Sequence, residues 1–141
     1  MTKTRGRRAL ALVGMPGAGK SVCAKHLESL GFFQFRFGGI VVREVLARSW
    51  PLTPENERIV REELRAKDGM AAIAKQAIPV LREALEEHPN IVIDGLYSWS
   101  EYKLLRKELD AELIVVAVIS ERGVRYDRLA RRKERPLSEK E

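Results

Sequence analysis

Residues 14–21 read Gly-Met-Pro-Gly-Ala-Gly-Lys-Ser, and this octapeptide constrains the fold more than any other feature of the 141-residue chain. It satisfies the pattern G-x-x-x-x-G-K-[ST] of phosphate-binding loops without a gap. A short apolar run, residues 10–13, precedes it, which is typical of a buried parallel strand that meets a turn. Apolar residues then recur at i, i+4 and i+7 from Cys23 until Gly31. The sequence therefore predicts strand, loop and amphipathic helix in the order that phosphate binding requires.

Each residue type of the octapeptide has a chemical task. The glycines permit backbone angles and close approach that a β-carbon would block. Successive N–H groups from Gly17 to Ser21 then face inward as an anion-binding nest at the positive end of the helix dipole. The Lys20 ammonium group would reach the β- and γ-phosphates of ATP, and the Ser21 hydroxyl would bind Mg²⁺. A glycine-rich turn that merely links strand to helix leaves the Lys-Ser pair unexplained. The predicted nucleotide-binding residues are Gly14, Gly17, Ala18, Gly19, Lys20, Ser21 and Val22.

The rest of the chain alternates between strand-like and helix-like patterns. Further strands are predicted at residues 33–37, 91–93 and 113–119, and the continuous β-branched run at 113–119 is typical of a central strand covered on both faces. Thr53 before Pro54, and Ser98 three residues before Glu101, are helix-start signals. The pattern predicts a three-layer α/β sandwich with a mostly parallel sheet that lacks a final strand and helix. Helices are predicted at 40–48, from Thr53, at 70–85 with a kink at Pro79, at 98–109 and at 122–132.

The formal net charge of +6 is concentrated at the two ends of the chain. Residues 1–8 contribute +4 and residues 121–141 contribute +3, so the remaining body is close to neutral. We interpret residues 1–8 as a flexible, solvated tail, although a polyanion could bind there, and expect no nucleic-acid partner. The longest apolar run is too short to cross a bilayer and no signal peptide is evident. A single cysteine excludes an internal disulfide. The sequence thus indicates a soluble cytoplasmic protein and carries no signature of an oligomeric state.

Four segments together resemble the adenylate-kinase-like P-loop kinases: residues 14–21, 38–44 (Gly-Gly-Ile-Val-Val-Arg-Glu), 53–56 (Thr-Pro-Glu-Asn) and 92–95 (Val-Ile-Asp-Gly). The closest resemblance is to a small, mainly archaeal branch, and dephospho-CoA kinase is a more distant relative. The similarity implies a sheet of strand order 2-3-1-4-5 within a single domain, 9–141. It also implies a helical acceptor-binding insertion at 38–88, a lid at about 122–141, and Mg²⁺-dependent phosphoryl transfer from ATP to a nucleotide or a related small acceptor.

The resemblance extends to individual site residues. Arg43 matches the arginine that grips the acceptor phosphate, a task that suits the forked guanidinium group. Asp94 would hold an Mg²⁺-bound water or orient the acceptor. Arg128 and Arg132, with Arg135 as a further candidate, resemble lid arginines that contact the transferring phosphoryl group. Each residue also has a structural alternative. Arg43 could be an exposed helix arginine, Asp94 a turn aspartate, and the C-terminal arginines part of a solvated basic helix. The catalytic candidates are Lys20, Asp94, Arg128 and Arg132, and the metal ligands are Ser21 and Asp94.

Two positions depart from the family pattern. Gly39 stands where an acidic residue is usual, and Tyr97 replaces an arginine that is common after the Asp-Gly pair. These departures favour an ATP-binding regulator or weak ATPase without an acceptor, whereas Arg43, Asp94 and the lid-like arginines favour a small-molecule kinase. A nucleic-acid-binding protein led by its basic tail is a third possibility. The sequence favours the kinase.

Overall fold

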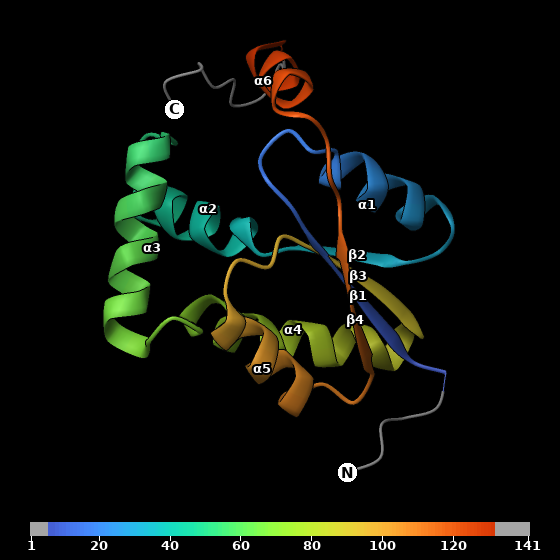
Figure 1. Cartoon of the computed structure of the whole chain (residues 1–141). Helices are drawn as coiled ribbons and strands as arrows, with labels where there is room; N and C mark the ends of the chain where they lie inside the picture. The colour runs from blue at the N-terminus through green and yellow to red at the C-terminus, as the bar shows by residue number, and fades with distance from the viewer. Residues whose placement is uncertain (1–5, 132–141) are drawn as a thin grey trace.

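The computed structural model describes residues 6–131, which form a four-stranded parallel sheet with helices on both faces (Figure 1). The sheet order is β2-β3-β1-β4, so the two strands that lie side by side at the centre are distant in sequence. The elements are β1 (Arg8–Val13), α1 (Lys20–Ser29), β2 (Phe33–Arg36), α2 (Gly38–Ala47), α3 (Pro54–Asp68), α4 (Ala72–Glu87), β3 (Asn90–Asp94), α5 (Trp99–Glu108), β4 (Glu112–Ala117) and α6 (Arg122–Arg131).

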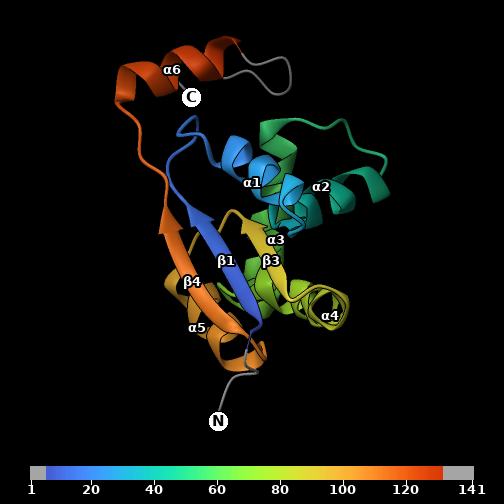
Figure 2. The ribbon, with the colours of Figure 1, turned by 90° about the vertical axis from the view of Figure 1, so that its right-hand side faces the viewer.

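The sheet separates two apolar cores. On one face α1 packs against β1, β2 and β3 over a small core built around Leu12, Ala24 and Val92. On the other face α4 and α5 lie against β3 and β4 above a larger core (Figure 2). The predicted three-layer α/β sandwich and its parallel sheet are therefore confirmed, and the four strands follow the order that the resemblance implies.

Most of the predicted elements lie within a few residues of their expected positions. The strand expected at 33–37 ends at Arg36, because Phe37 already serves as the N-cap of α2. The two helix-start signals are confirmed: the Thr53 side chain accepts a hydrogen bond from the Asn56 amide at 3.1 Å, and Ser98 does the same for Glu101 at 3.2 Å. Pro79 lies inside α4, which runs on past it to Glu87.

The prediction for the last strand is wrong in one respect. Within residues 6–131, β4 pairs only with β1 and forms an edge of the sheet. Val115 and Val116 are 43% and 38% exposed instead of being covered on both faces. A continuous β-branched run indicates side chains that fit a pleated, half-buried surface, and it does not reveal which strands lie on either side.

The topology brings three chain segments to one end of the sheet. The carboxyl ends of parallel strands lie at the same end of the sheet, and here the loops after β1, β2 and β3 meet at that end. Asp94 at the end of β3 lies in register with Leu12 of β1 and Arg36 of β2. Helices α2 and α3 stand beside these carboxyl ends (Figure 1). No helix of the described residues is long and apolar enough to span a membrane.

Candidate functional site

The loop between β1 and α1 is held close to the segment that leads from β4 into α6. Gly17 has a φ of +81°, a value that side chains disfavour, and a Cβ there would lie 2.6 Å from the carbonyl oxygen of Arg125. A Cβ at Gly14 would collide with the carbonyl oxygen of Val118. Glycine is therefore required at both positions, for conformation and for space.

Several amide groups of this loop have no backbone acceptor within residues 6–131. Ala18 donates to the Met15 carbonyl at 3.1 Å, and Cys23 donates to Gly19 at 3.1 Å, which begins α1. Among the described residues, no backbone carbonyl accepts from the amides of Gly17, Gly19, Lys20 or Ser21. These four donors lie at the N-terminus of a ten-residue helix, where the helix dipole favours negative charge.

Lys20 lies at the mouth of this nest. Its ammonium group donates to the Gly14 carbonyl at 2.5 Å, so the side chain folds back over the loop. Partial burial lowers the pKa of Lys20 from its ordinary value, and the nearby Asp94 carboxylate opposes this by raising it. The protonation of Lys20 therefore depends on its burial and on the Asp94 carboxylate.

Asp94 joins the loop to the neighbouring strands. It is 7% exposed at the end of β3, the Ser21 hydroxyl donates to its Oδ2 atom at 3.5 Å, and the Arg36 guanidinium lies 3.8 Å from the same oxygen. A hydroxyl and a carboxylate are the hard oxygen ligands that Mg²⁺ prefers, usually in company with substrate phosphates. No group of three or more His, Cys, Asp or Glu side chains in residues 6–131 could hold a metal alone. Ser21 and Asp94 therefore fit a phosphate-bound Mg²⁺.

A set of contacts that we call the α6 clasp fastens the outer side of the loop. The Ser120 hydroxyl donates to the Ala18 carbonyl at 2.9 Å. Nη1 of Arg128 donates to the carbonyls of Gly17 and Ala18 at 3.2 and 3.3 Å and to the Ser120 hydroxyl at 3.3 Å. Arg125 donates to the Ser120 carbonyl at 3.3 Å. A cationic side chain from α6 is thereby placed beside the phosphate-binding loop.

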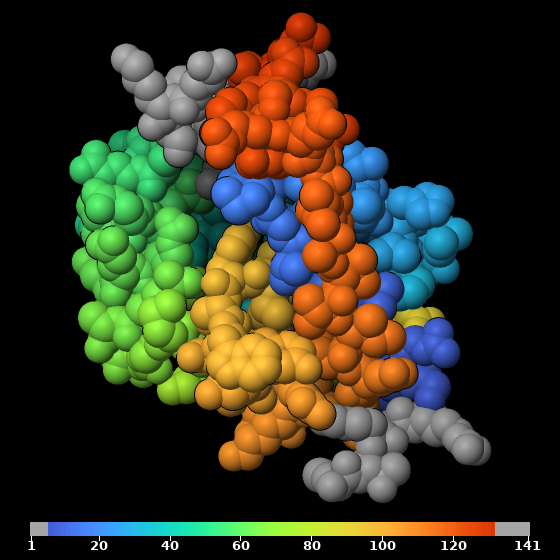
Figure 3. Space-filling view, in the orientation of Figure 1, coloured from blue at the N-terminus to red at the C-terminus, as the bar shows by residue number. Residues whose placement is uncertain are grey.

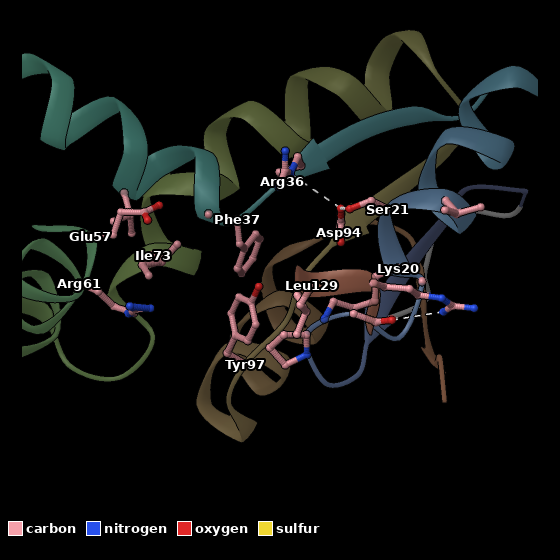
Figure 4. A pocket seen from close by; sticks show the side chains of 17 residues that line it. Lys20, Ser21, Arg36, Phe37, Glu57, Arg61, Ile73, Asp94, Tyr97 and Leu129 are labelled. Atoms are coloured by element: carbon pink, nitrogen blue, oxygen red, sulfur yellow. Dashed lines mark hydrogen bonds and ion pairs between the residues drawn. The ribbon is translucent and has the colours of Figure 1, made fainter. Parts of the chain in front are cut away.

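A cavity of about 510 Å³ opens in front of the loop (Figure 4). In the space-filling view a hollow separates α3 from the segment after β3 (Figure 3). Seven of the residues that line the cavity belong to the predicted site: Gly17, Gly19, Lys20, Ser21, Val22, Asp94 and Arg128.

Three of the predicted residues that the structure describes are not part of this lining. Gly14 and Ala18 support the loop from outside the cavity, and Ala18 is buried. Arg43 is exposed on α2 and does not line the cavity. Arg132 lies outside the described residues, as does Arg135. The structure thus gathers the loop, Asp94 and Arg128, and leaves Arg43 apart from them.

The cavity also contains charged residues that sequence reasoning missed. Arg36 comes from the end of β2, and Glu57 and Arg61 lie one turn apart on α3. Glu57 is only 5% exposed. One signal was present: Glu57 shares a helix face with Val60 and Leu64, so a carboxylate occupies the apolar side of α3. A carboxylate on the apolar side of a helix is unusual unless it is paired.

Comparison with known proteins places the chain among P-loop proteins. A family model described as an AAA domain matches residues 10–141. A UPF0200/UPF0201 protein of Archaeoglobus fulgidus is 37% identical over 126 residues, which cover 89% of this chain and 39% of that protein. A UPF0200 protein of Thermococcus onnurineus is 36% identical over 124 residues, which cover 87% of this chain and 67% of that protein. The chain thus spans about two thirds or less of the length of these relatives.

The fold is also similar to that of a solved kinase. A gluconokinase from Sinorhizobium meliloti superposes with a TM-score of 0.52 at 16% sequence identity, over 95% of this chain and 70% of that one. At this level of identity the likeness concerns the fold alone.

Proposed function

The chain belongs to the AAA domain family and to the UPF0200 proteins, and from this premise we propose that it transfers the terminal phosphoryl group of ATP to a small acceptor. The acceptor we propose is a nucleoside monophosphate or a related phosphorylated compound, as in the adenylate-kinase-like enzymes. Use of ATP as the donor is in keeping with a cytoplasmic location.

One observation carries this proposal. The cavity in front of the phosphate-binding loop is also lined by charged residues of another element, which are not needed to bind the phosphates of ATP. Lys20, Ser21 and Arg128 line it on one side, while Glu57 and Arg61 line it from α3. A protein that only binds or hydrolyses ATP requires room for water alone beside the terminal phosphate. A second, chemically distinct wall favours an acceptor molecule.

The described residues suit the donor side of such a reaction. The four amides at the start of α1 and the Lys20 ammonium group would hold the phosphates. Mg²⁺, when bound, would be held by the Ser21 hydroxyl and the Asp94 carboxylate and would neutralise charge on the phosphate oxygens. We assign charge stabilisation during transfer to Arg128, which already lies beside the loop, and to Arg132.

The transfer itself needs no further chemical group. The bond between the γ-phosphorus and the bridging oxygen breaks, and its electron pair leaves with ADP. With a nucleoside monophosphate as the acceptor, a new bond joins that phosphorus to an oxygen of the acceptor's phosphate, which is already anionic at neutral pH and needs no general base. Arg36 lines the cavity beside Asp94 and is the first candidate to hold this phosphate. Arg43 is exposed on α2 and does not line the cavity.

The test is the dependence of ADP release on an acceptor. In a coupled assay with ATP and Mg²⁺, a nucleoside monophosphate from a complete panel, or dephospho-CoA, should raise ADP release well above the rate without acceptor. Release that no acceptor accelerates would favour the ATP-binding regulator or weak ATPase instead. Lys25, an exposed lysine of α1, offers a control: Lys25→Ala should retain the activity that Lys20→Ala loses.

A further inference from the structure

The cavity has two chemically different ends (Figure 4). Lys20, Ser21 and Asp94 gather at one end, where phosphate chemistry belongs. Glu57 and Arg61 lie at the opposite end, on α3. The aromatic side chains of Phe37 and Tyr97 lie between the two ends and give the cavity an apolar middle. An acceptor that fills it needs an anionic end, a flat or apolar middle and a polar far edge.

The far end is built on one face of α3. Glu57 and Arg61 are spaced i, i+4, which places their Cβ atoms roughly 5–6 Å apart on the same side of the helix. Glu57 lies in the first turn, where the helix dipole favours a negative charge, and it is 5% exposed. A carboxylate so deeply placed needs several hydrogen-bond donors, and a ligand in the cavity can add to those that the protein supplies.

We propose that Glu57 and Arg61 recognise the base of a guanine nucleotide, so that the acceptor is a guanosine monophosphate or a close derivative. This inference rests on the proposed function and specifies its substrate. Guanine carries two adjacent donors, N1–H and the N2 amino group, which match the two oxygens of a carboxylate. Its O6 and N7 atoms are adjacent acceptors, which match the fork of an arginine.

The other common bases fit this pair less well. Adenine and cytosine each present a single amino donor, and uracil presents a single ring N–H. None of them offers two adjacent N–H groups to one carboxylate together with two adjacent acceptors to one guanidinium group. With the base at α3, the phosphate of the acceptor would lie toward Arg36 and Lys20 at the other end of the cavity.

Binding of the acceptor alone, measured by calorimetry on the 141-residue chain, tests the inference. Guanosine monophosphate should bind at least about tenfold more tightly than inosine monophosphate, which lacks the N2 amino group. Glu57→Gln, which preserves the side-chain volume, should weaken the binding of guanosine monophosphate about tenfold or more. It should also remove the preference for guanosine over inosine monophosphate. Glu55→Gln, a change at an exposed position of the same helix, should leave both affinities unchanged.

A second pair of variants tests the arginine. Arg61→Lys should weaken the binding of guanosine monophosphate by about tenfold, because the compact ammonium group lacks the planar fork that donates two parallel hydrogen bonds to O6 and N7. Arg58→Lys is the matched control, since Arg58 is exposed and pairs with Glu62. Unchanged thermal unfolding in all four variants would assign the losses to recognition and not to folding.

The outcomes separate this inference from the proposed function. If guanosine monophosphate binds as described but no acceptor stimulates ADP release, the kinase function fails and the guanine site stands. If another acceptor is phosphorylated and Glu57→Gln leaves its KM unchanged, the kinase function stands and the guanine site is overturned. Equal affinity for guanosine and inosine monophosphates would also overturn it.

Discussion

Gly17 shows how tightly a single residue of the phosphate-binding loop is constrained. It has a φ of +81°, and a Cβ would lie 2.6 Å from a backbone carbonyl of α6. We predict that Gly17→Ala lowers the midpoint of thermal unfolding and weakens ATP binding, because both the loop and α6 must shift. The two readouts are thermal unfolding and calorimetry with ATP and Mg²⁺.

Gly31 provides the matched control for this change. Its φ is +99°, yet nothing among the described residues lies within 4 Å of the position that a Cβ would take there. Gly31→Ala should therefore show only the conformational penalty, about 1–2 kcal/mol, and leave ATP affinity intact. If Gly17→Ala lowered the unfolding midpoint and the ATP affinity no more than Gly31→Ala, the close approach of α6 would contribute nothing to stability or binding.

The charge of Lys20 gives a prediction for pH. Burial lowers its pKa below the ordinary 10.5, and Asp94 partly restores it. A lysine is cationic below its pKa, so nucleotide affinity should decline on the alkaline side at a pH lower than an ordinary lysine would give. Asp94→Asn removes the carboxylate charge and lowers the pKa further. The alkaline loss of ADP binding, measured without Mg²⁺, should therefore move to lower pH in this variant, and an unmoved profile would contradict the assignment.

At the level of elements, the α6 clasp connects the segment after β4 to the loop. The Ser120 hydroxyl bonds to both the Ala18 carbonyl and Arg128. We predict that Ser120→Ala raises the KM for ATP severalfold with a smaller effect on kcat, since the loop is positioned less firmly while Lys20 remains. The loss of stability should be about 1 kcal/mol.

Two further variants make this prediction specific. Ser120→Thr retains the hydroxyl and should restore the KM. Ser29→Ala removes a comparable bond, from the Ser29 hydroxyl to the His26 carbonyl, at the far end of α1, and should not affect the KM. A parallel rise in KM for both alanine variants would show that the effect is general loss of stability.

The elements themselves differed in how well the sequence predicted them. The helix starts at Thr53 and Ser98 were predictable because a cap involves residues only three positions apart. The edge position of β4 was not, because it depends on which strands lie beside it. Phe37 was expected at the end of a strand but is the N-cap of α2. Its buried ring packs in the larger core, and this packing depends on elements that are distant in the sequence.

At the level of the whole molecule, one side of the cavity could be predicted from the sequence and the other could not. The phosphate-binding side is contiguous in the chain, so spacing alone revealed it, and Asp94 was predicted from the family resemblance of residues 92–95. The α3 side was hidden because Glu57 and Arg61 reach the cavity only when α3 folds beside the carboxyl ends of the strands. The similarity to known families emphasised Arg43, which lies outside the cavity.

The measurement that tests the central claim most directly is calorimetric titration of ATP and Mg²⁺ into the unmodified chain, Lys20→Ala and Lys25→Ala. If the loop at residues 14–21 grips the triphosphate, the unmodified chain and Lys25→Ala will bind ATP alike. Lys20→Ala will bind it at least about a hundredfold more weakly, with unchanged thermal unfolding, because the charge-assisted contact between the ammonium group and the phosphates is lost. Equal binding by Lys20→Ala and the unmodified chain would contradict the account.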